Sequence, residues 1–404
     1  MRACFPIGVL LAVLASVAVP PASAGQLDRE IAFWETRLER DPYDYISRIR
    51  LGTAYLQKAR VSGDYRQILR AESVLREALA RTPQSYDGLV ALAFALNAQH
   101  RFEDGARVAR QAVALRPQAL TGYGALGDAL FERGDVAGAA LAYDKLIELD
   151  GGLFALTRRA NLRHIRGDTP GAIEDLRHAV EIGRSRGAAV EEIARCHVSI
   201  GEKYFLRGAI DEAEQHYRQA LKLWPDGFLP MEHLARAYAA RGDFGAAVAL
   251  YEQVVAKAPH PDLLQAIGDA HAAMLDNDMA QRWYDRALEG YLKRSAEGDP
   301  SYYRHLAMFF ADIRPDPARS LDWARKDFEV RQNVYAYDTL AWALYRNGMF
   351  EEALDAANHA IEQGTEDVTL WLHAARIHEA LGQERAARQH FRRADEIRSA
   401  RRID

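Results

Sequence analysis

The sequence predicts an all-α solenoid of about ten helix-turn-helix units, because two series of small residues recur along it at matched intervals. Members of the second series follow members of the first by twelve residues, or by thirteen between Ala307 and Ser320. A period near 34 is typical of stacked helix pairs, in which small side chains let two helices approach closely. The first series, in which only the gaps after Ala160 and Gly268 are clearly wider than this period, is Ala93, Gly127, Ala160, Gly201, Ala235, Gly268, Ala307, Ala341 and Ala375.

The units also carry the turn residues that helix pairs need, and the sixth unit is the clearest example. There Gly242 can adopt the left-handed conformation that ends a helix, and Asp243 can cap the helix that follows. The same turn chemistry recurs at Gly134-Asp135, Gly167-Asp168 and Asn347-Gly348. Proline cannot continue a helix, so we expect units to end at Pro83, Pro117, Pro225 and Pro259.

These residues resemble the tetratricopeptide repeat, and the resemblance extends over nearly all of the chain from Gly25 onward. The large residue of the second helix appears as Leu75, Tyr143, Tyr217, Tyr251, Tyr284 and Phe391. The resemblance implies a right-handed superhelix whose first helices line a concave groove, a scaffold used in many processes. The predicted units span residues 45–83, 86–117, 120–151, 153–184, 188–226, 228–259, 262–296, 301–332, 334–365 and 367–402.

Some units depart from the pattern. In the first unit, Gly52 and Ala71 are nineteen residues apart, so about seven additional residues lie within 57–69. The fourth unit has Arg159 where a large apolar residue is expected. Stretches at 183–190 and 290–300 lengthen two connections. We expect these insertions to form longer helices or loops.

The segment 1–24 has the features of a cleavable signal peptide. Arg2 supplies a positive charge, the apolar run Ile7–Val19 is too short to span a bilayer comfortably, and Ala22-Ser23-Ala24 fits a cleavage site. We therefore expect an exported chain, periplasmic or secreted, that begins at Gly25. An uncleaved membrane anchor is the alternative.

The chain that remains after removal of residues 1–24 is expected to have two segments. Residues 25–43 are expected to form a capping helix before the solenoid of residues 44–404. That helix either docks on the first unit or recruits a partner through Ile31, Phe33, Trp34 and Leu38. After removal of the signal only Cys196 remains, either as a buried apolar residue or as a thiol that links to a partner.

The charge balance bears on the choice of partner. The whole chain has a formal charge of −5, and without Arg2 it has 51 basic and 57 acidic residues, a charge of about −6. This balance disfavours nucleic acid as a partner. The C-terminal segment is an exception, because it concentrates basic residues that form either a soluble cap or a patch for an anionic partner. The patch consists of Arg388, Arg392, Arg393, Arg401 and Arg402.

No motif predicts catalysis, a cofactor or a metal ion. Gly122, Gly124 and Gly127 fit a dinucleotide-binding spacing, but no strand precedes them and Gly127 is already a helix-contact residue. Asp276, Asn277 and Asp278 resemble the start of a calcium loop, but they lie in a turn where capping is expected. We therefore expect a protein without enzymatic activity.

The surface most suited to binding is the face of each first helix beside the small residue. Aromatic side chains there favour the capture of a peptide, and the alternative is that several of them pack against the neighbouring helix. The candidate residues are Phe94, Asp128, Phe131, Asn161, Glu202, Phe205, Arg236, Asp269, Met308, Trp342, Tyr345 and Arg376.

The sequence thus predicts an exported scaffold that binds a protein or peptide in its groove, in an envelope or secretion assembly. One alternative is a structural subunit that assembles with copies of itself. A ligand-binding or catalytic role is a third possibility, which a cluster of polar residues in one pocket would support.

Overall fold

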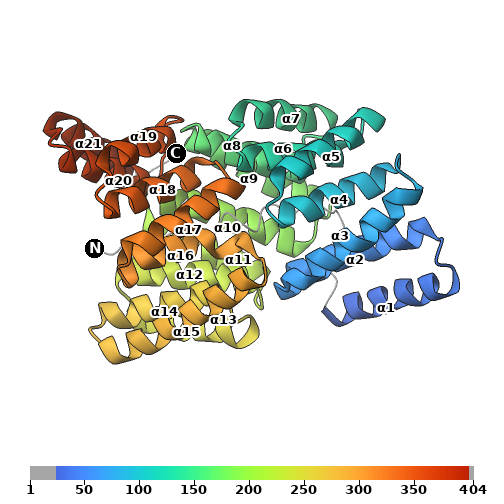
Figure 1. The fold of residues 1–404 in the computed structure, drawn as a ribbon, viewed down its shortest axis with the longest axis horizontal. Coiled ribbons are helices and arrows are strands. Elements are labelled where there is room, and N and C mark those ends of the chain that lie inside the picture. The colour runs from blue at the N-terminus through green and yellow to red at the C-terminus, as the bar shows by residue number, and fades with distance from the viewer. Residues whose placement is uncertain (1–23, 400–404) are drawn as a thin grey trace. The chain divides into compact units, whose positions relative to one another are not determined.

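The structure, a computed structural model, describes residues 24–399. Within that range it contains helices and no strand, so the predicted all-α class is confirmed. The expected signal segment falls on residues 1–24, of which 1–23 lie outside the described residues, as do Arg401 and Arg402. Figure 1 shows the helices following one another in antiparallel pairs.

Ten helix pairs follow the N-terminal helix α1 (Ala24–Arg40). The first helices of the pairs are α2 (Tyr45–Ser62), α4 (Tyr86–Ala98), α6 (Leu120–Glu132), α8 (Leu153–Ile165), α10 (Val190–Leu206), α12 (Phe228–Arg241), α14 (Pro261–Ala273), α16 (Tyr303–Met308), α18 (Val334–Arg346) and α20 (Val368–Ala380). The second helices are α3 (Tyr65–Arg81), α5 (Phe102–Leu115), α7 (Val136–Leu149), α9 (Thr169–Ser185), α11 (Ile210–Leu223), α13 (Phe244–Lys257), α15 (Asn277–Ala296), α17 (Pro317–Val330), α19 (Phe350–Ile361) and α21 (Glu384–Ser399).

The two kinds of helix occupy different sides of the stack. First helices of consecutive units contact one another, as α2 with α4, α4 with α6, α10 with α12, and α18 with α20. Second helices instead pack between the first helix of their own unit and that of the next, as α11 does between α10 and α12 and α19 between α18 and α20. First helices therefore lie on the inner side of the local curvature, where a groove would form.

The small residues make close helix contact possible. A Cβ on Gly127 would lie 2.3 Å from the ring of Tyr143, and one on Gly201 would lie 2.5 Å from Tyr217. In each case the tyrosine belongs to the second helix of the same unit and is buried. The alanines of both series are also buried, as their spacing predicted.

The turns have the predicted chemistry. Gly242 ends α12 with a φ of 93°, and the side chain of Asp243 accepts a hydrogen bond from the backbone of Ala246 at the start of α13. Asp276 caps α15 by accepting from the backbone of Met279, so the triplet that resembles a calcium loop is a capping sequence. Leu275, just before it, has a φ of 63° although it is not glycine.

The insertions form longer helices. Helices α2, α3, α9, α10 and α15 have 18, 17, 17, 17 and 20 residues, against 14 in α13 and 13 in α14. In the eighth unit, a 3₁₀ turn (η1, Pro300–Tyr302) precedes α16 and a π-helical turn (η2, Phe309–Ile313) follows it. A π turn accommodates one additional residue, which explains the spacing of thirteen between Ala307 and Ser320.

Helix α1 docks on the first helix pair. Leu27 and Ile31 are buried, and Trp34 and Leu38 are partly buried against the same apolar cluster. Phe33 points outward with 54% of its surface exposed. The docked alternative for this helix therefore accounts for all of its large apolar residues except Phe33.

The chain divides into two compact units between Arg159 and Ala160, within α8. We refer to the described residues 24–159 as the N-terminal unit and to 160–399 as the C-terminal unit. Over the described part of the chain, no helix combines the length and the apolar character that crossing a bilayer requires. Cys196 is buried in α10, and burial raises the pKa of its thiol to about 12, as expected for a structural residue.

Within the C-terminal unit, the loop between α19 and α20 returns to the end of α8. The hydroxyl of Thr365 donates a hydrogen bond of 2.6 Å to the backbone carbonyl of Ile165, 200 residues earlier. A Cβ on Gly167 would lie 2.7 Å from the backbone oxygen of Gly364, and Gly167 has a φ of 79°. Glycine is therefore required there for both reasons. We call these four residues, with Glu366, the closure contact.

Glu366 adds charge to the closure contact. Its carboxylate lies 3.5 Å from Nε of Arg207, a residue in the turn after α10, and 3.8 Å from Nη2 of Arg393 on α21. Arg207 and Glu366 are both largely buried, so their attraction is only weakly screened by water. The closure contact thus joins the turns after α8 and α10 to the last helix pair.

Candidate functional site

The predicted groove residues differ widely in exposure. Arg376 is exposed, and seven others are half-buried: Phe131, Asn161, Glu202, Phe205, Asp269, Trp342 and Tyr345. Phe94, Asp128, Arg236 and Met308 are buried. For these four, the burial agrees with the alternative that several candidates pack within the fold instead of facing a partner.

The four buried candidates each directly follow a small residue, as do the half-buried Trp342 and the exposed Arg376, so this position is covered only where neighbouring helices pack closely. This position faces the neighbouring first helix, and α4 with α6 and α16 with α18 pack closely enough to cover it. Phe94 and Met308 consequently belong to the apolar core, with 3% and 5% of their surfaces exposed. Asp128 and Arg236 are held in ion pairs instead.

Three inner carboxylates share one local arrangement. Asp128, Glu202 and Asp269 each follow a glycine of the first series and accept a hydrogen bond from a tyrosine hydroxyl of the second helix. The distances are 3.0 Å from Tyr143, 3.3 Å from Tyr217 and 2.8 Å from Tyr284. The glycine is needed because the tyrosine ring crosses directly over it. These acids are therefore fixed in position by their own unit.

Arginines from the next unit complete two of these arrangements. Arg158 contacts both oxygens of Asp128 at 2.8 Å, and Nη2 of Arg236 contacts both oxygens of Glu202 at 3.0 and 2.9 Å. Such charge-assisted contacts are among the stronger polar interactions in proteins. They join adjacent units across the inner face, which makes that face stiff.

The protonation states of the cluster formed by Glu202, His233 and Arg236 follow from burial and charge. Burial tends to raise the pKa of Glu202, but Arg236 and His233 outweigh it and lower that pKa. His233 lies 3.6 Å from Glu202, yet burial lowers its pKa to about 4. Arg236 also lies over the ring of Phe205 at 3.9 Å, so this predicted groove aromatic is partly covered. At neutral pH the cluster therefore holds Glu202 and Arg236 charged and His233 neutral.

Asn161 is occupied by a contact that sequence spacing did not indicate. Its side-chain oxygen accepts a hydrogen bond of 3.0 Å from Nζ of Lys203, which is buried. Burial lowers the pKa of Lys203 to about 8, although Glu202 opposes this shift. The pair joins α8 to α10, and 8% of the surface of Lys203 stays exposed.

The half-buried aromatics of α18 form a stack. The ring of Trp342 lies between Tyr345 and His373, with centroid distances of 4.8 and 4.1 Å and nearly parallel planes. The indole Nε1 donates to both oxygens of Asp312 at 3.1 Å, and His373 pairs with Asp338 at 2.8 Å. Burial lowers the pKa of His373, but Asp338 outweighs it and raises that pKa. Asp312 belongs to the π turn η2, so the inserted residue helps to place a carboxylate at this stack.

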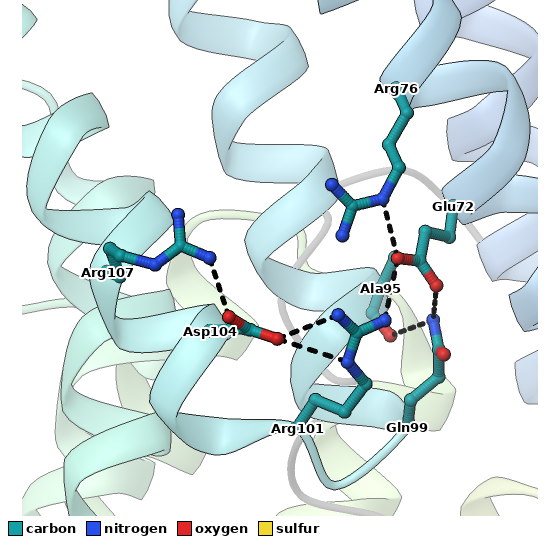
Figure 2. A network of polar contacts seen from close by, with 7 residues as sticks. All are labelled: Glu72, Arg76, Ala95, Gln99, Arg101, Asp104 and Arg107. Atoms are coloured by element: carbon teal, nitrogen blue, oxygen red, sulfur yellow. Dashed lines mark hydrogen bonds and ion pairs between the residues drawn. The ribbon is translucent and has the colours of Figure 1, made fainter.

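A second polar network lies on the surface between α3 and the α4–α5 turn (Figure 2). Glu72 of α3 accepts hydrogen bonds from Arg101 at 2.8 Å and from Gln99 at 2.7 Å. Asp104 then accepts from Arg101 at 2.7 Å and from Arg107 at 2.6 Å. Hydrogen bonds from Arg107 and Arg101 lower the pKa of Asp104. This network joins the first two helix pairs through side chains outside the inner face.

The predicted basic patch is visible in part. Arg388 and Arg392 are exposed on α21, and Arg393 is half-buried. The other two predicted members, Arg401 and Arg402, lie outside the described residues.

Nothing in the described residues assembles into a metal site, since no three His, Cys, Asp or Glu side chains converge there. Gly122 and Gly124 lie inside helix α6, where their missing Cβ atoms make room for Tyr86 and Phe154. Their spacing is therefore a consequence of helix packing.

Sequence reasoning missed the partners that come from the next unit. Arg158, His233 and His373 lie 30 to 35 residues after the acids that they contact. A search for acid and base pairs at about one repeat length would have found them. The acid and tyrosine pairs were also detectable, because all three are fifteen residues apart and follow a glycine.

Comparison with known families matches this repeat. Three models described as tetratricopeptide repeat match residues 90–153 and 339–401, residues 153–226, and residues 204–270. No curated protein matches the chain.

Several solved structures are similar. A tetratricopeptide repeat protein from Parabacteroides merdae is 19% identical, with a TM-score of 0.45, over 61% of this chain and 93% of that one. The human IFIT1 dimer with PPP-AAAA is 11% identical, with a TM-score of 0.49, over 98% and 94%. The APC/C hetero-tetramer Cut9–Hcn1 is 13% identical, with a TM-score of 0.38, over 93% and 91%.

Proposed function

Because the chain belongs to the tetratricopeptide repeat family, a family of interaction scaffolds, we propose that its inner face binds an extended or helical segment of a partner protein. One observation carries this proposal. The first helices leave the aromatic side chains of Phe131, Trp342 and Tyr345 half-buried, with part of each accessible. Trp and Tyr are enriched among the residues that dominate binding at protein interfaces.

The rigidity of the inner face supports the same function. Carboxylates on the first helices are held by tyrosines and arginines, as at Asp128 in the N-terminal unit and at Glu202 in the C-terminal unit. A surface whose side chains are already ordered loses less conformational entropy when a partner binds. The inner face therefore offers aromatic contacts on a preorganised support.

For its setting we propose export and a role in an envelope or secretion assembly. This rests on the charged, apolar and small-residue pattern of the segment 1–24. N-terminal sequencing of the protein isolated from its cell, in the envelope or medium fraction, tests the export step. A chain that begins at Gly25 supports it, and a chain that retains Met1 in the cytosol contradicts it.

A site-specific photo-crosslinker tests the binding surface. It is introduced at Phe131 and at Arg376, both on first helices, and in matched variants at Leu141 and Arg325, which are exposed on second helices. We expect adducts with another protein from the first-helix positions and not from the second-helix positions. Adducts only between copies of this chain would favour a self-assembling subunit, and equal adducts from all four positions would contradict an inner binding face.

A further inference from the structure

Three junctions between consecutive first helices pair an acid of one unit with a base of the next. The pairs are Asp128 with Arg158, Glu202 with Arg236, and Asp338 with His373. The helices that they join are α6 with α8, α10 with α12, and α18 with α20. At these junctions the chain itself supplies the base that a buried carboxylate needs, because an unpaired buried charge is costly.

The junction between α12 and α14 has an acid on both sides. Glu232 directly follows Met231, and Asp262 directly precedes Leu263, and these two apolar residues pack in one cluster where the helices meet. Only 7% of Glu232 and 9% of Asp262 remain exposed. Within residues 24–399, neither acidic side chain has a hydrogen bond or an ion pair. The junction therefore holds two buried carboxyl groups and no base of its own.

Two bases near this pair do not neutralise it. Nη2 of Arg236, one turn after Glu232, contacts both oxygens of Glu202 instead. Burial lowers the pKa of His305 in α16 to about 4, although the charge of Asp262 opposes this shift. His305 is thus uncharged at neutral pH, and its Nδ1 is buried without a hydrogen-bond partner in the described residues.

A proton takes the place of the missing cation in the isolated chain. Burial and the charge of Asp262 raise the pKa of Glu232 well above its ordinary value, although Arg236 opposes them. Glu232 is therefore protonated at neutral pH, which avoids two charged carboxylates side by side. A cation that binds between the two acids would displace this proton and regain the charge of Glu232.

We propose that Glu232 and Asp262 bind the charged end of a lysine or arginine side chain from the partner segment on the inner face. This inference rests on the proposed function, and it adds that the segment carries a basic residue opposite α12 and α14. The partner's cation would have the role that Arg158 and Arg236 have at other junctions.

The surroundings of the pair suit a long basic side chain. Gln265 lies one turn after Asp262 and is half-buried, so the pair is approached from the inner face. An ammonium group has three donors, and two carboxylates with a neutral imidazole nitrogen offer acceptors for them. The apolar stem of lysine can be buried while its charged end reaches the acids. A metal ion is less well served, since no three ligating side chains converge among the described residues.

The test attaches a cation beside the pair in the full chain. In the variant Gln265→Cys, the new thiol exchanges with an equimolar mixture of cystamine and hydroxyethyl disulfide, which add an ammonium or a hydroxyl group on the same two-carbon tether. Cys196 is buried with a raised thiol pKa and does not compete. Mass spectrometry of the intact chain measures the ratio of the two adducts. We expect the ammonium adduct to exceed the hydroxyl adduct at least tenfold.

The variant Thr157→Cys is the matched control. Thr157 lies three residues before Ala160, as Gln265 lies three before Gly268, and it is half-buried on α8 next to Arg158, which pairs with Asp128. The two adducts should differ less than twofold there. The preference at Gln265→Cys should also fall below twofold when Glu232→Gln and Asp262→Asn are added. Circular dichroism melting checks that each variant folds.

Equal ratios at the two tethering positions would overturn the proposal, as would a preference that survives the loss of both carboxyl groups. Loss of the preference in equimolar calcium chloride would assign the pair to a metal ion instead. The crosslinks from Phe131 and Arg376 test the inner face separately, so they can confirm a partner there even if this anchor fails. A tenfold preference without those crosslinks would assign the pair to a free organic cation and overturn its assignment to a partner segment.

Discussion

The network in Figure 2 and the cluster around Glu202 both join one helix pair to the next, but they differ in exposure. In the N-terminal unit, Arg101 reaches back to Glu72 across the surface, with 42% of its side chain exposed. In the C-terminal unit, Arg236 reaches back to Glu202 with only 3% exposed. Both arginines reach back to a carboxylate of the preceding helix pair, Arg101 from an outer turn and Arg236 from a first helix, so they set an exposed contact against a buried one.

Exposure decides what each network contributes. Water screens the Arg101 contacts, and such exposed pairs contribute about 0–1 kcal/mol. Arg236 is buried and only 13% of the Glu202 side chain is exposed, so loss of one partner would leave a largely buried charge without compensation. Similar topology therefore produces a replaceable network on the outside and an obligatory one on the inside.

We expect the largest difference in stability between the two networks from the substitution Arg236→Met. We expect a loss of about 3–5 kcal/mol in the free energy of unfolding, because Glu202 remains buried without its arginine. The matched variant Arg101→Met should lose about 1 kcal/mol or less. Urea unfolding followed by circular dichroism measures both, and hydrogen exchange locates the loss at α10–α12 or at α3–α5.

Adding Glu202→Gln to Arg236→Met provides the control. The double variant should recover part of the stability, since it removes the uncompensated charge. A second readout is the imidazole of His233, whose pKa should rise in Arg236→Met because Arg236 contributes to lowering it. Equal losses for Arg236→Met and Arg101→Met would show that burial is not the deciding factor.

Asp64 caps α3 and Asp367 caps α20. Their pH dependence extends the comparison of exposed and buried charges. Hydrogen bonds from Arg66 lower the pKa of Asp64 to about 2, although burial opposes them. Burial and the nearby Asp338 raise the pKa of Asp367 to about 6. The stabilisation from Asp64 is thus present above about pH 4 and lost as the pH falls toward 2, whereas that from Asp367 is complete below about pH 4 and lost as the pH rises through 6.

The asparagine variants should show opposite pH dependence. Asp64→Asn should cost about 1–2 kcal/mol at pH 7 and almost nothing near pH 2, whereas Asp367→Asn should gain about 2–3 kcal/mol relative to the natural chain between pH 4 and 7. Urea unfolding across this range measures both differences. Parallel pH profiles for the two variants would rule out opposite shifts.

The smallest effect concerns the two residues other than glycine with positive φ. Among the described residues, Leu275 of the C-terminal unit is 83% exposed, whereas His100 of the N-terminal unit is buried and its ring lies 5.4 Å from that of Phe102. Leu275→Gly should stabilise the chain by about 0.5–1 kcal/mol, because glycine tolerates this backbone conformation. His100→Gly should destabilise it by about 1–2 kcal/mol through lost packing.

Thermal unfolding measures both changes. Here the buried residue is in the N-terminal unit, so the pair separates burial from position in the chain. Destabilisation by Leu275→Gly would indicate that this exposed side chain makes a contact that the isolated chain does not reveal.

The repeat itself could be read from the sequence because its causes are local. A small residue, a left-handed glycine and a capping aspartate each act within one helix pair, as at Ala235, Gly242 and Asp243. The spacing of thirteen at Ser320 marked an anomaly, but it did not identify a π turn. Several helical distortions add one residue, and the sequence does not choose among them.

The candidate site was predicted less well because its causes lie between units. Whether Phe94 or Phe131 reaches solvent depends on how closely the next first helix packs, and the sequence of one unit does not determine that distance. Asn161 meets Lys203 across an insertion of irregular length. Contacts across a regular interval, such as that of Glu202 with Arg236, could have been predicted from the period of 34 residues.

The closure contact changes how the C-terminal unit should fold. A linear array of repeats interacts only between neighbours, so it can start folding at any unit and fray at either end. The bond between Thr365 and Ile165 instead closes a circuit of 200 residues. Its loop-closure entropy is lost only when the units between have formed, which raises the contact order and places this step late. The last helix pair should therefore exchange its amide hydrogens together with α8, as one cooperative element, and not as a frayed end.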